Sequence, residues 1–126
     1  MRSRKTHGKK VVIEAAATTL PAPTLATDGG DLTTWGSGPR TDTAALTIDS
    51  DGTGTITGGY IAGYDAQDAK WRNIAPLDGG LTVSLTAGIG FERRLRDVGA
   101  LDAIQVVGAV TGGITLAIAI KPIERQ

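Results

Sequence analysis

The sequence contains no cysteine and has few aromatic residues. The absence of cysteine excludes a disulfide framework, a thiolate zinc site and a cysteine nucleophile. Two tryptophans, two tyrosines and one phenylalanine in 126 residues leave the core to valine, isoleucine and leucine. Burying one such side chain stabilises a fold by roughly 1.5–3 kcal/mol. We therefore expect a single domain with a thin core, which would gain stability by packing against neighbouring molecules.

The sequence also lacks a long hydrophobic run. The longest apolar stretch, residues 114–120, is far shorter than the ~20 residues that span a bilayer. Residues 11–13 are too few to form the apolar region of a signal peptide. We expect neither a signal peptide nor a membrane partner.

No arrangement of residues predicts catalysis. The single histidine, His7, lies among like charges in a basic segment, where no partner or pocket is expected to position it. The glycine pairs at 58–59 and 79–80 open no predicted helix, as a phosphate-binding loop would require. Residues 49–54 resemble the start of a calcium loop but lack its terminal glutamate, so a plain turn is the preferred interpretation. We predict no enzymatic activity, cofactor or metal.

Charge divides the chain into two parts. The first ten residues sum to +5, and the remaining residues, with eight bases and thirteen acids, sum to −5. The bases of this arm are Arg2, Arg4, Lys5, Lys9 and Lys10. Such a segment binds a partner surface electrostatically, remains a solvated tail or contacts nucleic acid. We favour the partner surface, and nucleic acid least, because the body is acidic and carries no aromatic RNA-binding motif.

Residues 18–42 are rich in proline, glycine and threonine. A structureless stretch of this length is unusual inside a compact domain, so we predict an extended connector that crosses the surface of a partner. Trp35 lies within it and is either a plug into its own domain or an anchor in a partner pocket. Residues 10–17 form a short strand, within this chain or only on a partner. The predicted division is therefore a basic arm and connector over 1–42 and a folded domain over 43–126.

The body reads as short strands separated by turns. Alternating or β-prone segments are 44–48, 55–64, 70–74, 81–86, 103–110 and 114–120. Residues 91–98 fit a short helix or an extended segment, and we favour the latter because two turns of isolated helix are marginal. About seven short strands without helices predict an antiparallel, jelly-roll-like β-sandwich.

The last two strands are the clearest pattern. We predict that 103–110 and 114–120 form a β-hairpin closed by residues 111–113. In the second strand, isoleucines and a leucine line one face, and Thr115, Ala117 and Ala119 line the other. Outward residues this small predict that a loop or another subunit packs there, since a strand facing water more often carries charge.

Three segments resemble small jelly-roll-like β-sandwich domains of tailed-phage virion proteins. They are YIAGYDAQDAKWRNI (60–74), GIGFERRLRDVGAL (88–101) and DAIQVVGAVTGGITLAIAI (102–120). The resemblance implies a homo-oligomeric capsid decoration, or cement, protein that binds the major capsid protein on the capsid surface. Ala117 and Ala119 stand where such domains often carry arginine or valine, so the outer surface is expected to be used differently.

Two other functions stay open at this point. One is a tail, neck or fibre-base subunit of the same kind of particle. The other is a carbohydrate-binding module, in which Tyr60, Tyr64 and Trp71 would form an aromatic platform; the same residues could equally be cross-strand packing pairs.

Overall fold

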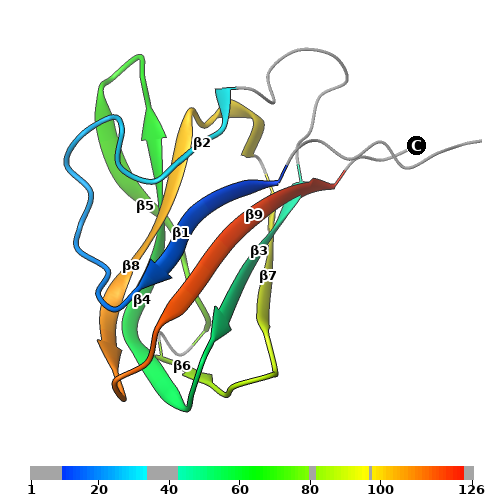
Figure 1. Ribbon diagram of the computed structural model, residues 1–126. Helices are drawn as coiled ribbons and strands as arrows, with labels where there is room; N and C mark the ends of the chain where they lie inside the picture. The colour runs from blue at the N-terminus through cyan, green and yellow to red at the C-terminus, as the bar shows by residue number, and fades with distance from the viewer. Residues whose placement is uncertain (1–9, 34–42, 80–81, 97, 124–126) are drawn as a thin grey trace, which may run out of the picture.

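Two antiparallel β-sheets lie face to face in the computed structural model, which describes residues 10–33, 43–79, 82–96 and 98–123 (Figure 1). The first sheet has the order β1 (Val11–Ala17), β9 (Leu116–Ile123), β3 (Thr43–Ser50), β7 (Phe91–Arg96). The second has the order β2 (Gly30–Asp31), β8 (Ala103–Thr111), β4 (Gly54–Asp65), β5 (Lys70–Pro76). The predicted all-β antiparallel sandwich is confirmed.

The long strand β4 carries two partners along one edge. β5 pairs with its second half, and β6 (Thr82–Leu85) pairs with its first half. A short 3-10 helix, η2 (Val98–Ala100), follows β7. The extended conformation favoured for 91–98 is therefore found over Phe91–Arg96 and gives way to η2 at Val98.

The core follows from period-2 alternation along the strands. Leu46 and Ile48 of β3 are fully buried and pair with Ile120 and Ile118 of β9, so all four side chains point between the sheets. On the facing sheet, inward residues of β4 and β8 meet them. The large side chains of these two strands that are fully buried are Ile56, Ile61, Ile104 and Val106.

The glycine pair in β4 forms a β-bulge. The register between β4 and β8 shifts between Thr57 and Tyr60, and Gly58 has a φ of 65°. A Cβ atom on Gly59 would lie 2.9 Å from Cδ2 of Leu77, which is fully buried. The bulge therefore makes room for Leu77 to enter the core.

The predicted terminal hairpin is wrong. β8 pairs with β4 and β2, whereas β9 pairs with β3 and β1, so the two strands belong to different sheets. The connection between them crosses the end of the sandwich, where Ile114 is buried. Alternation fixes which side of a strand is buried but not which strand lies beside it. The inward positions were nevertheless predicted correctly, since Leu116, Ile118 and Ile120 are buried.

The predicted boundary at residues 42 and 43 also needs correction. β1 pairs with β9, and β2 pairs with β8, so the sandwich begins at Val11. Between them, residues 18–29 cross this chain's own surface rather than that of a partner (Figure 1). Leu20 is buried and forms a bridge with Gly108, and the N–H of Leu32, also buried, donates to the Asp102 carbonyl. These apolar anchors fill core space that the body alone would leave open.

The side of the sandwich that holds β1 and β2 is closely packed. A Cβ atom on Gly30 would lie 2.8 Å from Cγ1 of Val11 and 2.9 Å from Cγ1 of Ile13. Gln105 of β8 is buried there; its Nε2 donates to Oε2 of Glu14 at 3.3 Å, and its Oε1 accepts from the N–H of Val106. The first strand is therefore tied to both sheets.

A pair of leucines tests whether the connector belongs to the fold. Leu20→Ala removes a side chain that is 6% exposed and should lower the free energy of unfolding by about 2–5 kcal/mol. Leu25→Ala, at a side chain that is 63% exposed in the same segment, should change it by less than about 0.5 kcal/mol. Urea denaturation measures both. Equal small effects would mean that the connector contributes nothing to stability.

Candidate functional site: the outer face of the four-stranded sheet

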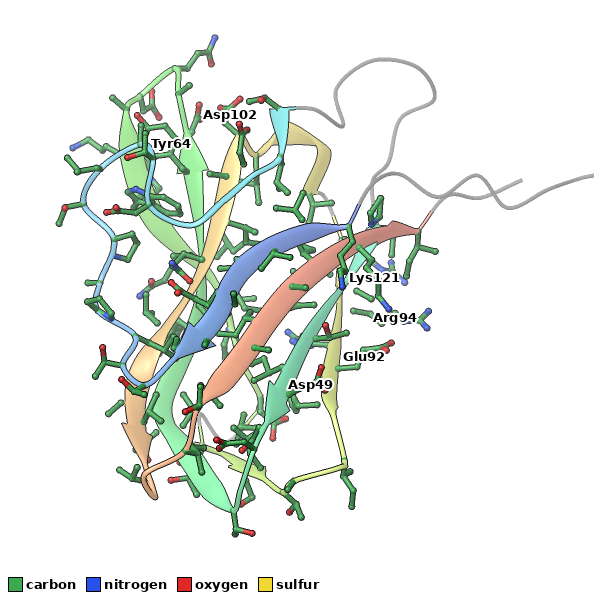
Figure 2. All side chains as sticks on the ribbon, in the orientation of Figure 1. Asp49, Tyr64, Glu92, Arg94, Asp102 and Lys121 are labelled. Carbon is green, nitrogen blue, oxygen red and sulfur yellow. The ribbon has the colours of Figure 1, made fainter. Side chains whose placement is uncertain are left out.

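The outward side chains of β9, β3 and β7 form a surface that we call the outer face. Its charged members from these strands are Lys121, Asp49, Glu92, Arg94 and Arg96, of which Figure 2 labels the first four. Cations gather at one end of the face, and short side chains occupy the middle of β9 and β3. Each cross-strand row can be read from the pairing register.

One row is cationic at both sides. Ala45 of β3 pairs with Lys121 of β9 on one side and with Arg94 of β7 on the other. Ala45 is buried by its neighbours and reaches no further than its methyl group. The row therefore consists of two long cationic side chains on either side of a short, buried one.

The next row carries an acid at one side. Thr47 of β3 pairs with Ala119 of β9 and with Glu92 of β7, and Ala119 pairs with Val12 of β1, which is 53% exposed. One row further along the strands, Asp49 pairs with Ala117. Positive charge therefore gathers at one end of the face, and negative charge extends from the middle row at β7 to the other end.

The predicted packing residues lie on this face or at its end. Ala117 is exposed and Ala119 is half-buried, and both point outward from β9 as expected. Thr115 precedes β9 and is half-buried; its N–H donates to Oδ1 of Asp51 at 2.8 Å. Thr115 therefore holds the turn after β3 in place as well as bordering the face.

The basic arm meets the outer face at Lys10. Together with Lys121, Asp49 and Glu92, Lys10 lines a shallow depression of about 340 Å³. The other arm residues proposed for partner binding, Arg2, Arg4, Lys5 and Lys9, lie outside the described residues, as does Trp35. Within the described chain, the cationic end of the face is thus also the end at which the basic segment arrives.

The ion pairing on this face is weak. Nε of Arg94 lies 2.9 Å from Oε2 of Glu92, but both side chains are largely exposed, so the pair contributes little to stability. Over residues 10–33, 43–79, 82–96 and 98–123, neither Lys121 nor Asp49 forms a salt bridge.

The neighbouring edge of the sheet is unsuited to strand addition. Arg93 of β7 pairs with Leu46, which points inward, so its side chain enters the seam between β7 and β5. Its Nε is buried and has no hydrogen-bond partner among the described residues. An inward-pointing charge on an edge strand opposes pairing with another strand. The outer face is therefore a better contact surface than the β7 edge.

The three aromatic residues do not form a flat platform. The rings of Tyr64 and Trp71 lie 5.3 Å apart at an angle of 49°. Trp71 is half-buried, and its indole N–H donates to the Leu25 carbonyl at 2.9 Å. Beside Tyr64, a cavity of about 360 Å³ is lined in part by Asp31 and Asp102. Cross-strand packing accounts for Tyr64 and Trp71 better than a sugar-binding surface does.

The loop over Trp71 is held by a carboxylate. Oδ2 of Asp28 accepts the N–H groups of Leu25 and Thr24, each at 2.9 Å, and these bonds hold the pKa of Asp28 below its ordinary value of 3.8. The side-chain and backbone hydrogen bonds from Thr33 lower the pKa of Asp31 in the same way. Both groups favour the charged form in the folded state.

This loop should loosen in acid. Because the pKa of Asp28 is lowered in the folded state, its carboxylate stabilises the folded loop fully above pH 3.8. This stabilisation is lost as the pH falls through the lowered pKa. We expect a change in Trp71 fluorescence in that window, measured in a Trp35→Phe background, because Trp71 bonds to Leu25 in the loop. Asp28→Asn should remove this step. An unchanged acid step in Asp28→Asn would assign the transition to other carboxylates.

Comparison with known proteins leaves the chain without a family assignment. No family model matches it, and no curated protein does. It is similar to a solved chain from Bacillus endospore appendages, described as a novel family of disulfide-linked pili. The identity is 17%, the alignment covers 98% of this chain and 93% of that chain, and the TM-score is 0.35. At this TM-score the similarity carries no functional argument.

The described residues contain no helix with the length and apolar character needed to cross a membrane. They also bring no three histidine or acidic side chains together in a group that could hold a metal ion.

Proposed function

We propose that this chain is a structural subunit of a tailed-phage virion, a capsid decoration protein that binds the lattice of the major capsid protein and stabilises the head. The observation that carries the proposal is the outer face, with small residues at the middle of β9 and β3 and with Lys10, the last base of the arm, beside Lys121 at its cationic end. Such a surface suits contact with another protein. The sequence resemblance to virion domains is the reason for naming the capsid lattice as the partner.

The positive charge of the arm and of the outer face indicates what kind of surface they bind. The first ten residues carry +5, and Lys10, the last of their five bases, lines one depression with Lys121 at the cationic end of the face. This concentration of positive charge favours an acidic patch on the capsid, and long-range attraction would speed encounter with it. Repetition of the contact over a capsid lattice would add avidity to individually weak contacts.

Neutralising the arm should weaken binding without unfolding the protein. Replacing Arg2, Arg4, Lys5 and Lys9 by glutamine removes four charges that precede the first strand. If each of the four exposed contacts contributes roughly 0.2–1 kcal/mol, affinity for particles lacking this protein should fall between about fourfold and several hundredfold. Co-sedimentation with such particles, at low and high salt, measures the effect.

A matched control uses two bases of the other sheet. Lys70→Gln with Arg72→Gln changes exposed residues of β5 and should leave particle binding unchanged. Full binding by the arm variant would contradict the proposed role of the arm. Circular dichroism should be the same for all variants.

Copy number separates the head from other positions in the virion. A cement protein is expected at a copy number comparable with that of the major capsid protein, whereas a tail, neck or fibre-base subunit is expected in far fewer copies. Quantitative mass spectrometry of purified particles measures this ratio. Absence of the chain from the particle would overturn the virion proposal.

A further inference from the structure

We propose that the seam between β5 and β7 binds a carboxylate, which is held by Arg93 and supplied by an acidic side chain of a partner protein with an apolar residue beside it. The seam is an open side of the sandwich, because β7 ends the four-stranded sheet and β5 ends the other. The proposed function uses the arm and the outer face and does not require this site.

The seam contains a groove of about 510 Å³. Ile74 and Ala75 of β5 line one side of it, residues 93–96 of β7 line the other, and Leu101 completes the lining. Among the described residues, this lining includes three arginines and no acid. Its electrostatic potential therefore favours an anionic ligand.

Arg93 differs from the other two arginines of the groove because it points inward. It pairs with Leu46, whose side chain is buried, whereas Arg94 points outward and its Nε lies 2.9 Å from Glu92. The Arg93 side chain is half-buried, and its Nε is buried without a hydrogen-bond partner among the described residues. A buried donor of this kind has lost its hydration without compensation, and an acceptor oxygen from another molecule would satisfy it.

Apolar surface lies beside this guanidinium. Ile74 is a large apolar side chain that is nevertheless 43% exposed. A Cβ atom on Gly63 would lie 2.7 Å from Cδ2 of Leu101 and 3.4 Å from Cγ2 of Ile74, so these two side chains lie together over the same glycine. The groove thus combines a cationic donor with an apolar wall, and its ligand should combine a carboxylate with an apolar group.

These two features favour a protein ligand over a nucleic acid. The planar fork of an arginine matches the two oxygens of a carboxylate, and an apolar residue next to that acid would cover Ile74. A nucleic-acid backbone offers phosphate but no aliphatic side chain. It would also be repelled by residues 11–126, whose eight bases and thirteen acids sum to −5.

Insertion of a carboxylate differs from the addition of a strand at the β7 edge. Arg93 opposes a partner that brings only apolar or basic side chains into the seam, because the buried guanidinium then stays unpaired. A partner that brings an acid to this position supplies the missing acceptor. The same arginine therefore selects for one class of partner and against the rest.

Two short peptides test the inference. One has an aspartate between two leucines, the other has an asparagine in the same place, and both have blocked ends. In isotope-labelled protein, the aspartate peptide should shift the nuclear magnetic resonance signal of the Arg93 Nε–H group, with a dissociation constant of about 1 mM. The asparagine peptide should bind roughly 10- to 100-fold more weakly, because a hydrogen bond to a charged group contributes about 1.5–3 kcal/mol.

A pair of variants separates Arg93 from charge in general. Arg93→Met removes the charge and keeps an apolar stem, so it should bind both peptides equally weakly, as followed by the backbone amide signals of β7. In urea it should be at least as stable as the unchanged protein, because the group removed is an unpartnered charge. Lys121→Gln also removes one positive charge, from an exposed position on the outer face, and should leave both dissociation constants unchanged.

Three results would overturn the inference. They are equal binding of the aspartate and asparagine peptides, an Arg93 signal that is unmoved at about 10 mM aspartate peptide, and an equal shift caused by inorganic phosphate at the same concentration. The last result would mean that the apolar wall plays no part in selecting the ligand. Because the measurements use only purified protein and peptides, their outcome does not depend on the proposed function.

Discussion

Alternation along β9 is the constraint on which the rest of the structure depends. Leu116, Ile118 and Ile120 point inward and are buried, whereas Ala117, Ala119 and Lys121 point outward. The inward set supplies part of a core that has few aromatic residues to draw on. The outward set fixes the rows of the outer face, because the pairing of β9 with β3 aligns Lys121 with Ala45 and Ala117 with Asp49. A shift of one residue would exchange the two sets and lose both features.

The sequence predicts strands and faces far better than it predicts neighbours. The buried sides of residues 114–120 and 44–48, the bulge at the glycine pair and the extended segment 91–96 could all be read from local pattern. The sheet that each strand joins could not, because β8 and β9 look like a hairpin whether they pair with each other or with β4 and β3. Pairing is decided by contacts between distant segments, which single-sequence periodicity does not contain.

The connector shows the same limit in another form. Proline, glycine and threonine predicted a chain that crosses a surface, which is what residues 18–29 do. Composition gave no indication of whose surface it is, because the deciding contacts are single apolar residues, Leu20 and Leu32, that close core space on this chain. At the candidate site, Ala117 and Ala119 were predicted from their small size, but the cationic row across Ala45 was not, since its two cations come from strands more than forty residues away.

The β7 edge and the outer face of the four-stranded sheet differ in how well they suit contact with another protein. Arg93 points into the seam beside β5 and makes the β7 edge a poor template for an added strand, while its neighbour Arg94 points outward beside Ala45. Adjacent residues on one strand thus discourage the addition of a strand at the edge and place positive charge on the outer face.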